Sequence, residues 1–303
     1  MLQNTSHLLM IEPVNFGFNT ETAVNNTFQK QVTGNIQQNA LEEFRSLVTL
    51  LQINKIDVTV VKDTMDPYTP DSIFPNNWIS FHEDGSIFLY PMFAINRRLE
   101  RKENVLKAIK KKFVVTHITD LSSYEKQNIY LEGTGSMVLD RQNRIAYACI
   151  SVRTDITLFN EFCRSNNFIP LSFHANDTTG VSIYHTNVMM CIGDSYAIIC
   201  PQAISNDLER EKLITSIQNT NKEIISISPD QLDHFAGNML QVINADNERI
   251  LIMSTQAMHS LNKQQVSSLE KHNRIIHSPL HNIEMAGGGS ARCMIAEVFL
   301  QMK

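Results

Sequence analysis

The sequence has few cysteines and no long apolar run. Its five cysteines are scattered through 303 residues and form no CxxC pair, which argues against a disulfide framework and against a structural zinc site. No window approaches the roughly eighteen apolar residues of a membrane span, and the opening MLQNTSHLLMIEPV lacks the cationic start of a signal peptide. We therefore expect a cytoplasmic protein that neither crosses nor enters a membrane.

Basic blocks and nucleotide-binding motifs are also missing. The chain has 26 Lys plus Arg against 31 Asp plus Glu, so its net charge of −5 offers no electrostatic footprint for nucleic acid. The glycines of the segment GTG, Gly133 and Gly135, lack the third glycine of a dinucleotide loop, and no Walker, HExxH or GxSxG motif occurs. We expect no metal and no organic cofactor.

A strand-turn-strand pattern recurs along the chain. Its copies begin at Trp78, Ser136, Asn187 and Asn238, 51 to 58 residues apart, and their turns contain Gly, Asn or Asp. A further apolar segment, CMIAEVFL, begins at Cys293 and is a candidate partner for HLLMIEPV near the start. No Pro-, Gly- or Ser-rich linker interrupts the chain, so we expect a single catalytic domain over residues 1–303.

Stretches of helical period separate these hairpins. They cover residues 35–50, 96–112, 155–165 and 207–219. Each is followed by a short strand, drawn from DVTVV, FVVTHIT, FIPLSF and EIISIS, and RIIHSPL is a fifth. The pattern predicts an α/β fold of five ββαβ units closed into a ring, against the alternative of one open mixed sheet whose hairpins recur by chance.

In a closed ring, the residues just before each hairpin meet at one end. Those positions hold Asn76-Asn77, Glu132, His185, His234 and Cys293. Nucleophilic, titratable and amide side chains at equivalent places favour an active site over a structural role.

Cys293 follows GGGSAR, where backbone amides and Arg292 would favour its thiolate; the alternative is a small core residue. His185 suits proton transfer near neutral pH, although a structural histidine and a catalytic His234 remain open. Glu132, between an apolar strand and glycines, either faces a cavity that holds a substrate cation or amide, or lies on the surface.

Together these motifs resemble the pentein, or guanidine-modifying, superfamily over nearly the whole chain. The matching motifs are GGGSARC, HTN, LEGTG and FPNNW, and the opening HLLMIEPVNFGFNTETAVNN is similar to the branch of citrulline-utilisation hydrolases. The resemblance implies a five-fold pseudosymmetric α/β propeller. It also implies that Cys293 is the nucleophile, with His185 and Glu132 as its catalytic partners and Asn77 in place of a guanidinium-binding aspartate.

Two carboxamides depart from the arginine deiminase pattern. Asn77 and Asn187 each offer a donor and an acceptor, which suits a neutral ureido group better than a guanidinium. We therefore expect a hydrolase that converts citrulline to ornithine, ammonia and CO₂ through a covalent cysteine intermediate. The alternatives are an arginine deiminase-type hydrolase and a non-catalytic binding protein.

The expected partner is a small amino-acid substrate. Asn76, Asn77, Asn187 and Arg292 are its predicted binding residues, and the sequence does not decide whether Arg292, Arg97 or Arg153 binds its carboxylate. A homo-oligomer stays open.

Overall fold

Residues 2–303 are described by a computed structural model, and their strands form five three-stranded sheets. In one sheet, β3 (Ile79–Phe81) is antiparallel to β4 (Ser86–Leu89), which is parallel to β5 (His117–Asp120). Three further sheets repeat this pattern: β6 (Val138–Asp140), β7 (Ile145–Cys149) and β8 (Ile169–Phe173); β9 (Met190–Ile192), β10 (Tyr196–Ile199) and β11 (Glu223–Ser226); β12 (Leu240–Ile243), β13 (Arg249–Ser254) and β14 (Arg274–Ser278). All four predicted hairpins are thus present.

The fifth sheet joins the two ends of the chain. The strand β15 (Ala296–Glu297) pairs antiparallel with β1 (His7–Glu12), which pairs parallel with β2 (Asp57–Lys62). The expected pairing of CMIAEVFL with HLLMIEPV is confirmed. Because the strands form five separate sheets of one pattern, the alternative of one open mixed sheet is wrong.

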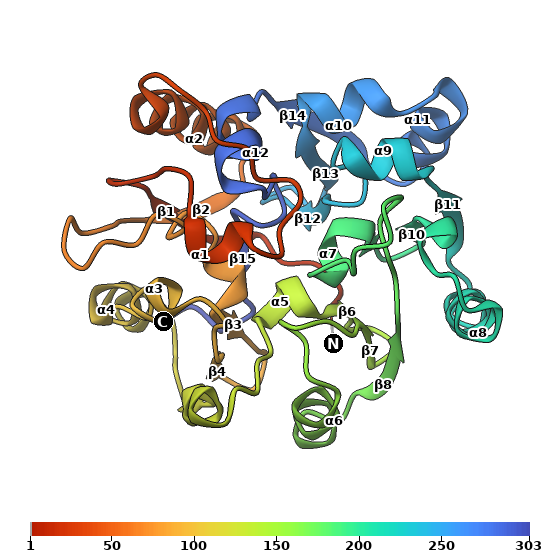
Figure 1. Cartoon of the computed structure of the whole chain (residues 1–303), viewed down its shortest axis with the longest axis horizontal. Helices are drawn as coiled ribbons and strands as arrows, with labels where there is room; N and C mark the ends of the chain where they lie inside the picture. The colour runs from red at the N-terminus through yellow and green to blue at the C-terminus, as the bar shows by residue number, and fades with distance from the viewer. Residues whose placement is uncertain (1) are drawn as a thin grey trace.

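Helices connect the second and third strands of the sheets and lie at the periphery of the molecule (Figure 1). They are α2 (Ile36–Ile53), α4 (Glu103–Lys112), α6 (Ile156–Ser165), α8 (Asp207–Gln218), α10 (Thr255–Ser260) and α11 (Lys263–Glu270). In α6, Asp155 caps the first turn by accepting from two backbone amides, and Leu158, Phe159, Phe162 and Cys163 form one buried face.

The predicted helix over 96–112 is interrupted. The structure has α3 (Ile95–Arg98), then a short break, then α4. The side chains of Arg97 and Glu100 are buried and form an ion pair at 2.9 Å, so this segment turns inward where a continuous surface helix would keep them in solvent. Because of this break, the side chain of Arg97 lies in the interior of the protein.

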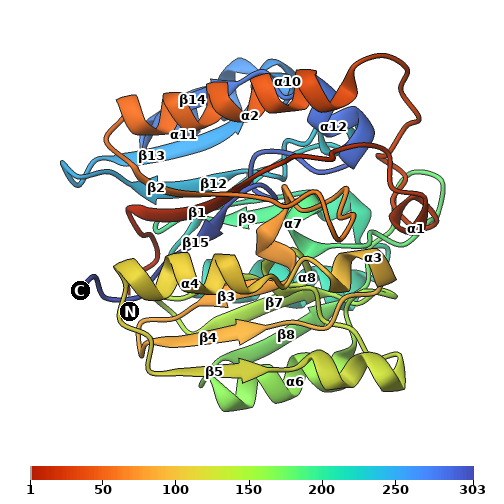
Figure 2. The ribbon, with the colours of Figure 1, turned by 90° about the vertical axis from the view of Figure 1, so that its left-hand side faces the viewer.

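Short helical segments precede the first strand of each sheet. They are η1 (Pro75–Asn77), α5 (Gly133–Ser136), α7 (Thr186–Met189), α9 (Pro229–Asp233) and α12 (His281–Gly287). The other short elements are α1 (Thr20–Ala23), η2 (Ser122–Gln127) and η3 (Pro201–Ala203). Figure 2 shows α1 at one end of the molecule and both chain termini at the opposite end.

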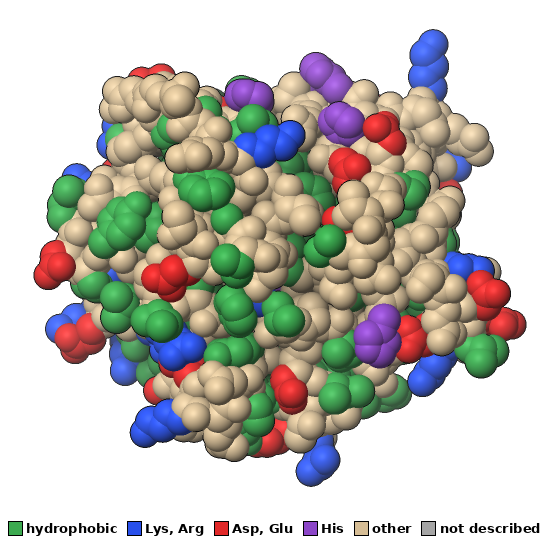
Figure 3. Space-filling view, in the orientation of Figure 1, with side chains coloured by type: hydrophobic (Ala, Val, Ile, Leu, Met, Phe, Trp, Pro, Cys, Tyr) green, Lys and Arg blue, Asp and Glu red, His purple; other side chains and the backbone are tan. Residues whose placement is uncertain are grey.

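The four cysteines other than Cys293 lie in the apolar interior and form no disulfide bond: Cys149, Cys163, Cys191 and Cys200. Burial raises the pKa of Cys149 and of Cys191 to about 12, which keeps both thiols protonated near neutral pH. Within residues 2–303, no helix is both long and apolar enough to cross a membrane. On the face seen in Figure 3, lysine and arginine side chains are dispersed and form no continuous basic patch.

Candidate active site

Cys293, His185 and Asn77 line one small cavity of about 20 Å³. They come from three different units of the fold, and each is almost fully buried. Three charged side chains that the sequence did not place there, or left open, also line this cavity: Asp71, Arg97 and Arg153. The cavity therefore combines a thiol, an imidazole, an amide and paired charges.

The thiol of Cys293 faces two carboxamides. Nδ2 of Asn187 lies 3.4 Å from its sulfur, and Nδ2 of Asn238 lies 3.2 Å away. The glycine run before Cys293 makes this placement possible, because a Cβ at Gly289 would lie 2.9 Å from the Phe74 ring and 3.2 Å from the Cβ of Cys293. A larger residue at position 289 would crowd Cys293.

Asn238 was missed as a site residue, although the sequence pattern used it to mark the start of the fourth hairpin. The fourth-unit candidate was His234, which is exposed and has Nδ1 at 2.7 Å from the carbonyl oxygen of Asp230. His234 lines a separate cleft beside Phe235. The repeat itself held the signal, since Asn187 and Asn238 open successive hairpins at equivalent positions.

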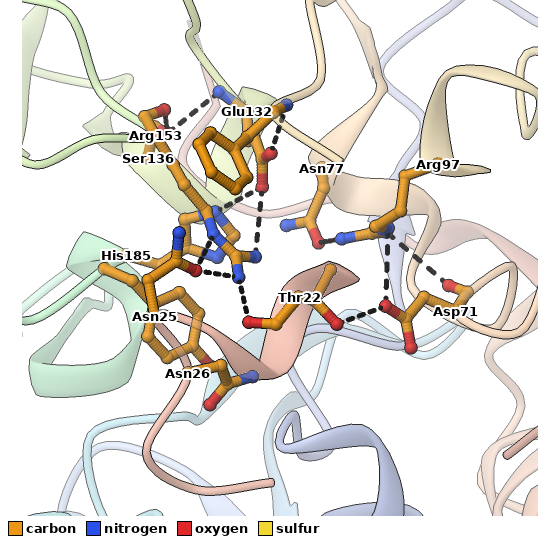
Figure 4. Close-up of polar contacts among 12 residues, drawn as sticks. Thr22, Asn25, Asn26, Asp71, Asn77, Arg97, Glu132, Ser136, Arg153 and His185 are labelled. Carbon is orange, nitrogen blue, oxygen red and sulfur yellow. Dashed lines mark hydrogen bonds and ion pairs between the residues drawn. The ribbon is translucent and has the colours of Figure 1, made fainter. Parts of the chain in front are cut away.

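Glu132 acts on His185. Its Oε2 lies 2.8 Å from Nε2 of His185 and 3.5 Å from Nη1 of Arg153 (Figure 4). Its Oε1 accepts from the backbone amide of Phe93 at 2.9 Å. Glu132 is fully buried, which excludes the surface alternative. With both oxygens engaged, it orients the imidazole rather than forming the cavity wall.

The charge states of this pair follow from their surroundings. Burial alone would raise the pKa of Glu132, but Arg153 and His185 hold it well below its usual value. Burial lowers the pKa of His185, with Glu132 opposing the shift, so the imidazole is neutral near pH 7. An ionised carboxylate at Nε2 requires a proton on Nε2, which leaves Nδ1 as a proton acceptor.

The orientation of the Asn77 amide is fixed by Arg97. Nη1 of Arg97 donates to Oδ1 of Asn77 at 2.7 Å, while two bonds at 2.9 and 3.0 Å tie the same guanidinium to Glu100. Because a guanidinium only donates, the amide oxygen must face Arg97. Nδ2 of Asn77 then has no hydrogen-bond partner among residues 2–303 and is the polar group that remains for a ligand.

Gly135 gives Asn77 and His185 the room they occupy. A Cβ at Gly135 would lie 2.3 Å from Nδ2 of Asn77 and 2.8 Å from Nδ1 of His185. The second glycine of LEGTG is therefore required by the packing of two site residues against its backbone.

A segment around α1 covers the cavity. Arg153 donates to the carbonyl oxygen of Thr22 at 2.9 Å and to Oδ1 of Asn25 (Figure 4). Its guanidinium lies 4.8 Å from the centre of the Tyr184 ring. Asn26 donates to the carbonyl oxygen of Gly288 at 3.3 Å. These bonds hold residues 22–26 over the site.

Of the four predicted substrate-binding residues, only Asn77 lines the cavity. Asn187 contacts the sulfur of Cys293 at 3.4 Å but lines a second small cavity together with Arg292. Arg292 lies next to Cys293 in the sequence, but its guanidinium pairs with Glu297 at 2.9 Å and donates to the carbonyl oxygen of Ile295. Asn76 is fully buried beside Asn77, and its backbone carbonyl accepts from Thr134. In the described part of the chain, no group of three or more His, Cys, Asp or Glu side chains is placed to hold a metal ion.

Solved structures with the same fold come from guanidine-related hydrolases. The apo structure of ArgZ, an arginine dihydrolase of cyanobacteria, has a TM-score of 0.76 at 19% identity, over 96% of this chain and 40% of its own. Its N-terminal domain, a cysteine-to-serine mutant bound to substrate, matches with the same TM-score and identity over 97% of this chain and 99% of that domain. DDAH from Pseudomonas aeruginosa, a cysteine-to-serine mutant complexed with citrulline, has a TM-score of 0.67 at 14% identity, over 98% and 100% of the two chains.

The chain thus spans about 40% of the length of whole ArgZ, and at these identities the likeness concerns the fold. No curated protein matches the sequence. A family model described as N,N dimethylarginine dimethylhydrolase, eukaryotic, matches residues 12–300. The chain therefore belongs to this dimethylarginine dimethylhydrolase family, within the guanidine-modifying pentein superfamily that its motifs resemble.

Proposed function

We propose that the protein hydrolyses the ureido group of citrulline, giving ornithine, ammonia and CO₂. The observation that carries this proposal is the fixed amide of Asn77. Arg97 holds its oxygen, so the cavity beside Cys293 receives an N–H donor. A ureido carbonyl oxygen accepts that hydrogen bond. A guanidinium has only N–H donors, so it would offer no acceptor to the N–H of Asn77.

The first half of the reaction uses Cys293 and His185. Nδ1 of His185 accepts the thiol proton, and the thiolate attacks the ureido carbon. The imidazolium returns the proton to the terminal nitrogen, which leaves as ammonia, and a thiocarbamate remains on Cys293. Glu132 stabilises the transient imidazolium through the 2.8 Å contact with Nε2.

In the second half, water replaces ammonia. His185 removes a proton from the water as it attacks the thiocarbamate carbon, and the carbon–sulfur bond breaks. The resulting N-carboxy-ornithine loses CO₂ to give ornithine, so citrulline and one water balance the three products. Asn77 holds the carbonyl oxygen in both halves, where negative charge develops.

The amino-acid end of the substrate suits Arg153 and Asp71. Arg97 is paired with Glu100 and Arg292 with Glu297, whereas Arg153 donates to neutral acceptors of the cover as well as lying near Glu132. A substrate carboxylate would replace those neutral acceptors. Oδ1 of Asp71 has no hydrogen-bond partner in the part of the chain described, so it can accept from the α-ammonium group.

Substrate entry requires the cover to move, because a cavity of about 20 Å³ has room for about one water molecule. We also infer that the five units close into the predicted propeller and that residues 1–303 act as one catalytic unit. The pairing of β15 with β1 and the meeting of residues from several units at one cavity support this inference.

Arginine is the second candidate substrate. The same fold occurs in ArgZ, which is named an arginine dihydrolase, and both possible substrates share an amino-acid end. We expect arginine to react more slowly than citrulline because its guanidinium has no acceptor for the Asn77 donor.

The test is incubation of the purified protein with citrulline, arginine or Nω,Nω-dimethylarginine in turn, followed by quantification of ornithine, citrulline and ammonia. Ornithine and ammonia in equal amounts from citrulline are expected. Citrulline accumulation from arginine, without ornithine from citrulline, would refute the substrate assignment. Cys293→Ala should abolish turnover, and Cys163→Ala, at an equally buried core cysteine, should not.

A further inference from the structure

Asn238 is placed to contact the reacting sulfur. It opens the fourth hairpin just before β12, and its side chain is almost fully buried. One N–H bond of its amide is directed to the carbonyl oxygen of Asn187 at 2.9 Å, and the same nitrogen lies 3.2 Å from the sulfur of Cys293. Its oxygen accepts from the backbone amide of Arg292 at 3.1 Å.

These contacts determine which way the amide points. The Arg292 amide requires an acceptor and the Asn187 carbonyl requires a donor, so Oδ1 and Nδ2 of Asn238 cannot exchange places without losing both bonds. The second N–H is therefore aimed at the sulfur. By contrast, Oδ1 of Asn187 has no partner among residues 2–303, so nothing there fixes the direction of that second amide.

We propose that Asn238 is a catalytic residue that stabilises the Cys293 thiolate by donating a hydrogen bond to its sulfur. A donor to an ionised acceptor gains more than a donor to a neutral one, so this contact favours the thiolate over the thiol. The thiolate is the nucleophilic form. The assignment rests on the proposed role of Cys293, and it means that the fourth hairpin unit also contributes a residue to the active site.

The same bonds give Asn238 a second, mechanical effect on the site. Through Arg292 and Asn187 it links the backbones on either side of the sulfur, the turn that carries Cys293 and the start of α7. A purely mechanical role would leave the thiol–thiolate balance unchanged when the donor is removed. The two roles are therefore separable by measuring the thiolate directly.

The informative variant is Asn238→Asp. It keeps the size of the side chain and the acceptor for Arg292. It replaces the amide nitrogen, which donates both to the Asn187 carbonyl and to the sulfur, by a carboxylate oxygen. The other titratable or charged groups that line the cavity remain in place: His185, Tyr184, Asp71, Arg97 and Arg153.

The thiolate is measured by its ultraviolet absorbance as a function of pH, taken as the difference between each protein and its Cys293→Ser counterpart. We expect the thiolate-to-thiol ratio near pH 7 to fall about tenfold or more in Asn238→Asp. Asn273→Asp is the matched control, because its buried amide also donates to a backbone carbonyl, that of Leu269, and should leave the ratio unchanged.

Turnover gives a second readout. With lost thiolate as the cause, the activity of the variant relative to wild type rises as the pH is raised, whereas a distorted site stays equally slow. Because the carboxylate in Asn238→Asp also repels a thiolate, Asn238→Ala is measured beside it: it removes the donor without adding a charge, and the same fall in the thiolate ratio is expected. A wild-type thiolate ratio in either folded variant overturns the proposal, and this measurement stands even if wild type hydrolyses none of the tested substrates.

Discussion

Replacing Asn77 by aspartate should shift substrate preference from citrulline toward arginine. In the wild-type site, Oδ1 of Asn77 accepts from Arg97 and Nδ2 is the free donor. Asn77→Asp keeps an oxygen for Arg97 and turns the free donor into a carboxylate oxygen. The new group accepts from a guanidinium and opposes a ureido carbonyl.

The size of the shift follows from the two hydrogen bonds that change. A charge-assisted bond to the guanidinium contributes about 1.5 to 3 kcal/mol, and the lost neutral bond to the ureido oxygen costs about 1 kcal/mol. Arg97 already neutralises part of the new charge, since it lies 2.7 Å from the same side chain, so the lower end applies. A total of about 2.5 kcal/mol changes the arginine-to-citrulline ratio of kcat/KM by roughly 50- to 100-fold.

The assay measures kcat/KM for both amino acids with wild type, Asn77→Asp and the buried control Asn273→Asp. Ornithine and citrulline are quantified separately, because deimination of arginine yields citrulline while ureido hydrolysis consumes it. The control should keep the wild-type ratio. An unchanged ratio in folded Asn77→Asp would show that this amide does not contact the reacting group, and the assignment to citrulline would lose its support.

Three further results are expected. Glu132→Gln should lower kcat at least tenfold with little change in KM, because Glu132 affects the substrate only through His185. A tenfold rise in KM with an unchanged kcat would contradict this. Gly135→Ala should abolish activity while the protein stays folded, because its Cβ would displace the Asn77 and His185 side chains; wild-type kinetics would refute the packing argument. Burial lowers the pKa of His82 from 6.5 to about 3, so between these two pH values the unfolded state binds more protons than the folded state. The stability of the wild-type protein should therefore fall as the pH falls from about 6.5 toward 3. In urea denaturation, His82→Gln should retain about 2 kcal/mol more of its neutral-pH stability at pH 4.5 than wild type does.

The repeat could be predicted because it depends on local signals. Alternating apolar residues with Gly, Asn or Asp at the turns define each hairpin, and the apolar face of 155–165 defines a helix. The helix over 96–112 was predicted as continuous because its period is helical throughout. In the structure the helix is interrupted where Arg97 is buried against Asn77 and Glu100. The contact between Arg97 and Asn77 joins residues twenty positions apart, so a local pattern does not reveal it.

The sequence by itself determined the repeating strand and helix pattern, because that pattern follows from residue type and short-range periodicity. The repeat and the resemblance to the pentein superfamily also made Cys293 and His185 candidate site residues. Tertiary structure alone decided that Glu132 orients His185, that Arg97 fixes the Asn77 amide, and that Asn238 rather than His234 meets the sulfur. Hydrogen-bond direction depends on which groups converge from distant units, and no local pattern encodes that convergence.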